Sequence, residues 1–296
     1  MLLNRAAATC SLFRFNKNLF FVGNYSQKGH NHDVIFNYLQ GRYEGIAVIG
    51  LNRPEQKNSF SVNLVKELSR YIDKINYENL ARVVVLRSMT PKIFCAGADL
   101  KERAEMTPRE VCNFLTNLRA LMNKLQNIPV PVIAAIDGVA LGGGLEMALA
   151  CDIRVASSDS KMGLVETKLA IIPGAGGTQR LPRIVGPSIA KELIFTSKIV
   201  DGKAAHALGL VNHVLEQDEK GEAAYIKSLE IAEEILPNGP LALQMAKMAI
   251  NRGIEVDLET GLTIEEACYA QIIPTKDRIE GLSAFKEKRK PKYQGA

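Results

Sequence analysis

Two glycine-bearing segments could each present a backbone amide to a ligand. Ala96–Asp99 follows an apolar stretch, and Gly97 within it permits backbone angles that turn neighbouring N–H groups outward. Gly142–Gly144 comes directly before a predicted helix, whose free amides and positive end favour an oxyanion. Negative charge on the carbonyl oxygen of a thioester enolate requires two such donors. The two segments could therefore supply one donor each.

Two carboxylates lie beside these segments. Glu146 falls in the first turn of the predicted helix, and Glu166 precedes the segment 169–174. Taken alone, each is explained as well by a structural role, Glu146 by complementing the helix dipole and Glu166 by a salt bridge or exposure. Hydrating a double bond conjugated to a thioester needs one group to take a proton from water and another to protonate the α-carbon. The order of roles is open in the sequence; we assign Glu146 to water activation and Glu166 to α-carbon protonation.

Other chemistries receive less support. His206 and His213 adjoin no motif, so a packing or capping role is favoured for both. The segment Gly174–Thr178 does not complete a nucleotide-binding glycine motif. No cysteine is spaced from another, or from a histidine, as metal ligands are, so we expect no metal site and a reducing compartment. The five cysteines are Cys10, Cys95, Cys112, Cys151 and Cys268.

The elements that would position these groups alternate between strand and helix. Apolar stretches predict strands at 46–51, 83–86, 132–136 and 153–156, and amphipathic or capped stretches predict helices at 62–72, 108–125 and 143–150. Beyond residue 178 the pattern is mainly helical, with helices expected near 187–196, 201–207, 223–235, 240–251, 258–271 and 276–288. We therefore predict one domain, an α/β core at 33–200 with a helical C-terminal region at 201–296.

The first 32 residues have the composition of a mitochondrial transit peptide. They contain Arg5, Arg14, Lys17 and Lys28, and no acidic residue precedes Asp33. A short disordered tail is the alternative. The formal net charge of +5 over 296 residues suits a polyanionic ligand such as coenzyme A but decides little. No apolar run is long enough to span a bilayer, so we expect a soluble protein.

Several ordered blocks resemble the signatures of the enoyl-CoA hydratase (crotonase) family. They lie at 94–100, 131–146, 150–154 and 172–181, within a similarity that covers roughly residues 43–292. The resemblance implies a ββα superhelix core with a helical C-terminal oligomerisation region, oxyanion amides at Ala98 and Gly143, and catalytic carboxylates at Glu146 and Glu166. It also implies substrate and coenzyme A contacts at Lys57, Ala96, Asp99, Leu100, Lys101, Gly142, Pro173 and Gly174.

The presence of both glutamates favours a hydratase over an isomerase or hydrolase of the same family. Segments 94–103, 161–173, 264–271 and 274–281 look most like hydratases of leucine breakdown. That resemblance implies conversion of 3-methylglutaconyl-CoA to 3-hydroxy-3-methylglutaryl-CoA in the mitochondrial matrix, by a trimer or a dimer of trimers, without metal or redox cofactor. A short-chain enoyl-CoA of fatty-acid oxidation is the alternative substrate. Which residue binds a distal substrate carboxylate is open.

A second function rests on three bases at helical spacing. Lys66, Arg70 and Lys74 would lie on one helix face, and a relative in the family is thought to bind AU-rich RNA through a lysine-rich version of this helix. Glu67 and Asp73 dilute the charge, and no aromatic run of an RNA-stacking module accompanies it. A solvated helix face is the simpler interpretation. A mainly RNA-binding protein with a relict pocket is the third class that we consider.

Overall fold

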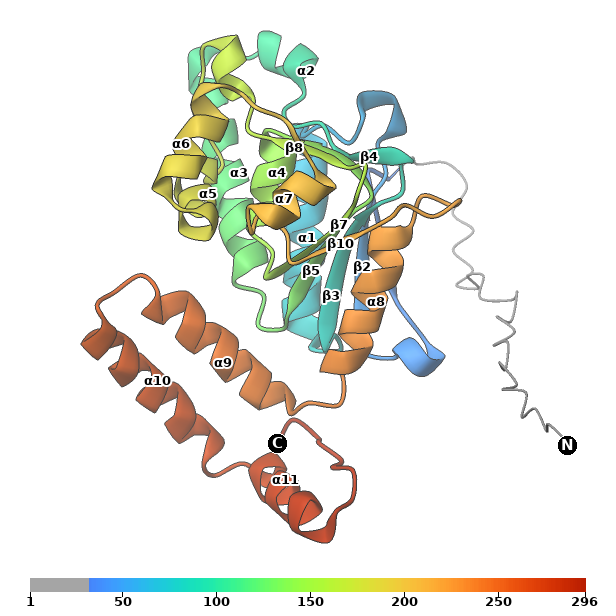
Figure 1. Ribbon diagram of the computed structural model, residues 1–296, viewed down its shortest axis with the longest axis vertical. Coiled ribbons are helices and arrows are strands. Elements are labelled where there is room, and N and C mark those ends of the chain that lie inside the picture. Colours follow the sequence, from blue (N-terminus) through green and yellow to red (C-terminus); the bar gives the residue numbers. More distant parts are fainter. Residues whose placement is uncertain (1–31) are drawn as a thin grey trace, which may run out of the picture. The chain divides into compact units, whose positions relative to one another are not determined.

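The computed structural model describes residues 32–296 (Figure 1). Its main sheet has six strands. The sheet is parallel except for its first pair, which is antiparallel. In spatial order the strands are β1 (Val34–Tyr38), β2 (Ile46–Leu51), β3 (Val83–Ser88), β5 (Val132–Ile136), β7 (Ile153–Ser157) and β10 (His213–Leu215).

A smaller sheet of four short strands lies beside the main one. Its order is β4 (Lys92–Cys95), β6 (Gly138–Leu141), β8 (Lys161–Gly163) and β9 (Val200–Asp201). The first three of these strands each follow a main-sheet strand directly: β4 follows β3, β6 follows β5 and β8 follows β7. Each such pair leads into helical structure, so the chain repeats a ββα unit. This confirms the fold expected from the family resemblance.

The central strands of the main sheet are mainly apolar because helices cover both faces. Successive residues of a strand point to opposite sides, and in β2 Ala47 and Ile49 enter one core cluster while Ile46 and Val48 enter another. The first cluster packs against α1 (Val62–Glu78) and α3 (Pro108–Gln126). The second packs against α8 (Ala223–Ile235). The sheet is thus a rigid layer between helices.

Shorter elements complete this part of the fold. Between β4 and α3 lies α2 (Leu100–Ala104), and β6 leads through Gly142 into the fully buried α4 (Gly143–Leu149). The remaining short helices are α5 (Gly177–Val185), α6 (Pro187–Phe195) and α7 (Gly202–Ala207), and the 3-10 turns are η1 (Gly41–Tyr43), η2 (Pro54–Gln56) and η3 (Glu166–Leu169).

The last three helices extend away from the two sheets (Figure 1). They are α9 (Pro240–Gly253), α10 (Leu258–Ile272) and α11 (Lys276–Glu287). The Lys247 ammonium group of α9 donates to Asp152 Oδ2 at 2.7 Å and to the Val130 carbonyl oxygen at 3.0 Å, which ties α9 to the core. Large apolar side chains on these helices remain exposed, among them Ile250, Ile254, Leu258, Leu262, Tyr269, Leu282 and Phe285.

The described structure adds elements that the sequence did not predict. They include β1 and all four strands of the smaller sheet. The core also extends beyond residue 200 into the region expected to be helical, because β10 joins the main sheet and α8 packs against that sheet. None of the helices in residues 32–296 is long and apolar enough to cross a bilayer. The expected transit peptide lies outside the described residues, apart from its last residue, His32.

Candidate active site

The two glycine segments meet at one edge of the smaller sheet. Strands β4 and β6 are parallel neighbours, so their carboxyl ends, followed by Gly97 and Gly142, lie together. Gly97 has φ +96°, and a Cβ atom there would lie 3.0 Å from the Leu141 carbonyl oxygen and 3.5 Å from the Gly143 nitrogen. Only glycine fits both the backbone angle and the close approach.

Two backbone N–H groups at this junction are free to bind an oxyanion. Phe60 N–H donates to the Gly97 carbonyl at 2.7 Å, and Asp99 N–H donates to the Phe60 carbonyl at 3.1 Å, which anchors the segment on either side of Ala98. The Gly143 amide is at the first residue of α4 and therefore has no partner within the helix. Within residues 32–296, neither the Ala98 nor the Gly143 N–H donates a hydrogen bond.

Glu146 is buried, with 2% of its surface exposed, and its carboxylate is held firmly. Its Oε1 accepts hydrogen bonds from Ala175 N–H at 2.8 Å and Gly177 N–H at 2.7 Å. Burial raises the pKa of Glu146, whereas these two amides and the Arg180 charge oppose that rise. The carboxylate is therefore fixed through one oxygen, and its other oxygen can address a water molecule.

Glu166, the first residue of η3, is held less tightly. Its Oε2 is buried and has no hydrogen-bond partner within the described residues, while its Oε1 lies 3.1 Å from the position a Cβ atom would take on Gly142. Burial, with the nearby Glu146 charge, raises the pKa of Glu166 to about 7. One carboxylate is thus stabilised by amides, and the other can hold a proton near neutral pH.

Arg180 of α5 braces the loop that holds Glu146. Its guanidinium group donates to the Ala175 carbonyl at 3.1 Å and to Gln126 Oε1 and Asn123 Oδ1 of α3, both at 2.9 Å. We did not predict a role for Ala175, Gly177 or Arg180 from the sequence. The run of glycines before α5 was the available signal, but it was weighed only as a nucleotide motif and as part of the family signature at 172–181, without a role for these three residues.

The remaining predicted contact residues surround this junction in different environments. Lys57, Leu100 and Lys101 are exposed, as groups that meet a large ligand must be. Asp99 is engaged within the protein: it caps α2 and pairs with Arg53 at 3.3 Å. The others are Ala96, whose N–H donates to the Lys57 carbonyl; Gly142, beside Glu166; and Pro173 and Gly174, on the loop that leads to Ala175.

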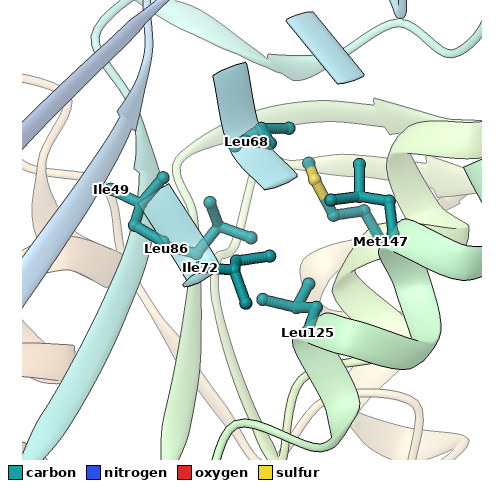
Figure 2. Close-up of a pocket in the computed structure, with 7 residues that line it drawn as sticks. Ile49, Leu68, Ile72, Leu86, Leu125 and Met147 are labelled. Atoms are coloured by element: carbon teal, nitrogen blue, oxygen red, sulfur yellow. The ribbon is translucent and has the colours of Figure 1, made fainter. Parts of the chain in front are cut away.

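Glu146 and Glu166 line neither of two cavities found in other parts of the described residues. A cavity of about 10 Å³ behind α4 is lined only by apolar side chains, including Met147, Leu125 and Ile72 (Figure 2). It has room for about one water molecule but no polar partner for it, so we regard it as a packing defect. A larger cavity of about 500 Å³ lies between α9 and the Cys151–Arg154 segment.

Metal-binding geometry and histidine chemistry find no support in the described part of the chain. No group of three or more His, Cys, Asp or Glu side chains in residues 32–296 could hold a metal ion. His206 Nδ1 contacts the Val211 carbonyl oxygen at 3.2 Å, and His213 is an exposed residue of β10. His206 is exposed as well, on α7.

The three bases proposed for RNA lie exposed on α1, as predicted. Lys74 pairs with Glu78 at 3.8 Å and lies 5.4 Å from the centre of the Phe36 ring. The Arg70 guanidinium group stacks over Tyr71 at 4.7 Å. Part of this charge is therefore already engaged within the protein.

The comparisons with known proteins agree with this geometry. The family model described as enoyl-CoA hydratase/isomerase matches residues 41–296. A human protein named methylglutaconyl-CoA hydratase, mitochondrial, is 60% identical over 272 residues, which cover 92% of this chain and 80% of that protein. A mouse protein named enoyl-CoA hydratase domain-containing protein 2, mitochondrial, is 52% identical over 257 residues, 87% of each chain.

A solved structure shares the fold as well. The enoyl-CoA hydratase from Bacillus anthracis superimposes with a TM-score of 0.85 at 48% identity, covering 89% of this chain and all of that one. The predicted family is therefore confirmed by a match along nearly all of the described residues. The chain belongs to the enoyl-CoA hydratase/isomerase family.

Proposed function

We propose that this protein is a mitochondrial hydratase that converts 3-methylglutaconyl-CoA to 3-hydroxy-3-methylglutaryl-CoA. The substrate follows from the 60% identity to a protein of that name, and the location from the mitochondrial names of both relatives. The observation that carries the chemistry is a pair of carboxylates, one bonded to two amides and the other with an unpaired oxygen, beside two free amides within residues 32–296. The substrate supplies coenzyme A, and the reaction proposed here needs no further cofactor.

The amides act on the thioester. Its carbonyl oxygen accepts hydrogen bonds from the Ala98 and Gly143 N–H groups, which stabilise the negative charge that develops as the β-carbon is attacked. The positive end of α4 adds to this stabilisation, because Gly143 opens that helix. The coenzyme A moiety extends toward Lys57 and Lys101, whose exposed ammonium groups match its phosphates.

The two glutamates divide the proton transfers. Glu146, oriented by hydrogen bonds from two amides, takes a proton from the water whose oxygen bonds to the β-carbon. Glu166, protonated near neutral pH, delivers its proton to the α-carbon as the enolate collapses. Water is thereby added in full, and proton exchange between the two carboxyl groups restores the starting state.

Self-association completes the proposal. Enzymes of this family bind acyl-CoA and oligomerise, and here the exposed apolar side chains of α9, α10 and α11 form a surface suited to a second copy. We propose a trimer, or a dimer of trimers, built through this surface.

The decisive experiment measures initial hydration rates on 3-methylglutaconyl-CoA and crotonyl-CoA side by side. We expect a preference for the branched dicarboxylate and a loss on the order of 10²–10⁴-fold in kcat for Glu146→Gln and for Glu166→Gln. Glu234→Gln removes an exposed carboxylate of α8 and serves as the control. Activity only on crotonyl-CoA would mean that the substrate is a short-chain enoyl-CoA. Activity that survives both substitutions would refute the two-glutamate mechanism.

RNA binding along α1 is a second and separate proposal, favoured by the exposure of Lys66, Arg70 and Lys74 on one face. Each phosphate contact that such a face makes should steepen the salt dependence of binding. The test is the affinity for AU-rich RNA of a variant with all three bases replaced by glutamine. An unchanged affinity would reject this face as an RNA site and leave the hydratase proposal intact.

A further inference from the structure

Arg103 has a guanidinium group without a polar partner. The side chain extends from α2 over the Phe114 ring of α3, with 4.8 Å between the guanidinium carbon and the ring centre. Within residues 32–296 it makes no hydrogen bond or ion pair, and its Nε atom is buried. Stacking on an aromatic ring compensates a charge only in part, because the N–H donors in the plane of the group remain unused.

This arrangement is unfavourable unless an anion joins it. A buried donor without a partner loses its hydration and gains nothing in return. Burial also lowers the pKa of Arg103, which expresses the same cost. A carboxylate can satisfy two donors of one guanidinium group at once, and such a pair is among the strongest polar contacts in proteins.

Arg103 follows the oxyanion segment closely in the chain. Its N–H donates to the Asp99 carbonyl at 2.9 Å, so it is one helical turn beyond the oxyanion segment that contains Ala98. Its ring partner Phe114 precedes Leu115, whose side chain packs against Gly174. The same loop continues to Ala175, which binds Glu146. Arg103 therefore lies between the oxyanion segment and the α3 wall of the site.

Other cations near this wall are already engaged. Arg180 donates to three acceptors, one of them the Ala175 carbonyl. Arg119 is exposed and donates to the Gly174 carbonyl at 3.3 Å and to Thr116 at 3.4 Å. Of these three arginines, Arg103 alone keeps its donors available for a ligand.

We propose that Arg103 binds the distal carboxylate of a dicarboxylic acyl-CoA and so selects such thioesters over monocarboxylic ones of similar length. The inference deepens the proposed function, on which it rests for the identity of the substrate. The selectivity itself is a property of binding and does not depend on turnover.

The test is calorimetric titration with glutaryl-CoA and butyryl-CoA, two saturated thioesters that differ by the distal carboxylate and cannot be hydrated. We expect the wild-type protein to bind glutaryl-CoA more tightly than butyryl-CoA. Arg103→Met should weaken glutaryl-CoA binding about 10–100-fold and change butyryl-CoA binding less than threefold. Arg103→Lys keeps the charge but loses the two-donor geometry. Its affinity for glutaryl-CoA should therefore lie between that of the wild-type protein and that of Arg103→Met.

Two comparisons make the result decisive. Arg109→Met removes an exposed arginine near the start of α3, and it should leave the ratio of the two dissociation constants unchanged. Equal weakening of both ligands in Arg103→Met would mean a merely structural role and would overturn the proposal, as would unchanged binding of glutaryl-CoA. If the selectivity depends on Arg103 but 3-methylglutaconyl-CoA is not hydrated, the proposed substrate fails and the binding role of Arg103 stands.

Discussion

Glu166 lies close enough to Glu146 for the charge of one carboxylate to raise the pKa of the other. The two side chains differ in their partners, since Glu146 accepts two amide hydrogen bonds while Glu166 Oε2 accepts none from the described residues. This asymmetry separates a base from an acid within one site. The pH dependence of both the hydration rate and the folding stability follows from it.

The rate of hydration should fall at alkaline pH. Because burial and Glu146 raise the pKa of Glu166 to about 7, the acid form is lost as the pH rises through that value. We expect an alkaline limb in kcat/KM with an apparent pKa of about 7 that belongs to the pair of carboxyl groups. A pH–rate profile from 5 to about 9 checks this, and Glu166→Gln should retain a weak activity without that limb. A flat profile over this range would contradict the assignment of Glu166 as the acid.

Because of the same raised pKa, Glu166 destabilises the folded protein at high pH. Between its ordinary value of 4.5 and about 7, the folded protein holds a proton that the unfolded chain has lost. The stability linked to Glu166 is therefore complete below pH 4.5 and lost as the pH rises through 7. Glu166→Gln should raise the free energy of unfolding at pH 8 by about 1–2 kcal/mol, after discounting for solvent screening.

Urea unfolding of the wild-type and variant proteins at pH 5 and pH 8 measures this difference. The gain should be present at pH 8 and mostly absent at pH 5, because both proteins are then neutral at this position. A variant that is destabilised equally at both pH values would show that the Glu166 carboxylate is paired in the folded protein.

Sequence patterns predicted the long apolar segments and the roles of some single residues. The strands β2 and β5 are continuous apolar runs, β3 begins with four apolar residues, and β7 is apolar apart from Arg154 and its terminal Ser157, so their patterns are visible locally. By contrast, β6 is four residues long and pairs only with distant segments, so no local pattern marks it. The whole smaller sheet was missed for this physical reason, although its edge carries the site.

The site was predicted in the same uneven way. Glu146 and Glu166 were chosen because their residue type and place beside the glycine segments match a chemistry, and Ala98 and Gly143 were chosen through the family resemblance. Arg180 was not chosen, because its role depends on a carbonyl five residues earlier and on two side chains of α3. Contacts of this kind are set by tertiary packing and leave little trace in local sequence.

Gly177→Ala should impair catalysis by displacing Glu146. A Cβ atom at Gly177 would lie 2.8 Å from Leu164 Cδ1 and 3.0 Å from Glu146 Cγ and Oε1, so the carboxylate must move. We expect kcat to fall by about 10²-fold, the effect of a shift of roughly 1 Å at a reacting group. Gly239→Ala is the matched control, because its Cβ atom would meet nothing closer than 3.7 Å. Equal activity of the two variants would show that Glu146 does not need this fixed position.

The exposed apolar surface of the C-terminal helices should hold the oligomer together. Leu262 on α10 is 55% exposed and Phe285 on α11 is 87% exposed, an arrangement that favours burial against another subunit. Replacing both with glutamate would place charges in that contact, where they lose their hydration without gaining partners. We expect light scattering coupled to gel filtration to show a smaller particle than the wild-type trimer or hexamer. Tyr77→Glu changes a residue of α1 that is 91% exposed and should leave the mass unchanged. If the double variant keeps the wild-type mass while Tyr77→Glu reduces it, the subunits meet through α1, and the surface proposed for RNA would be buried in the assembly.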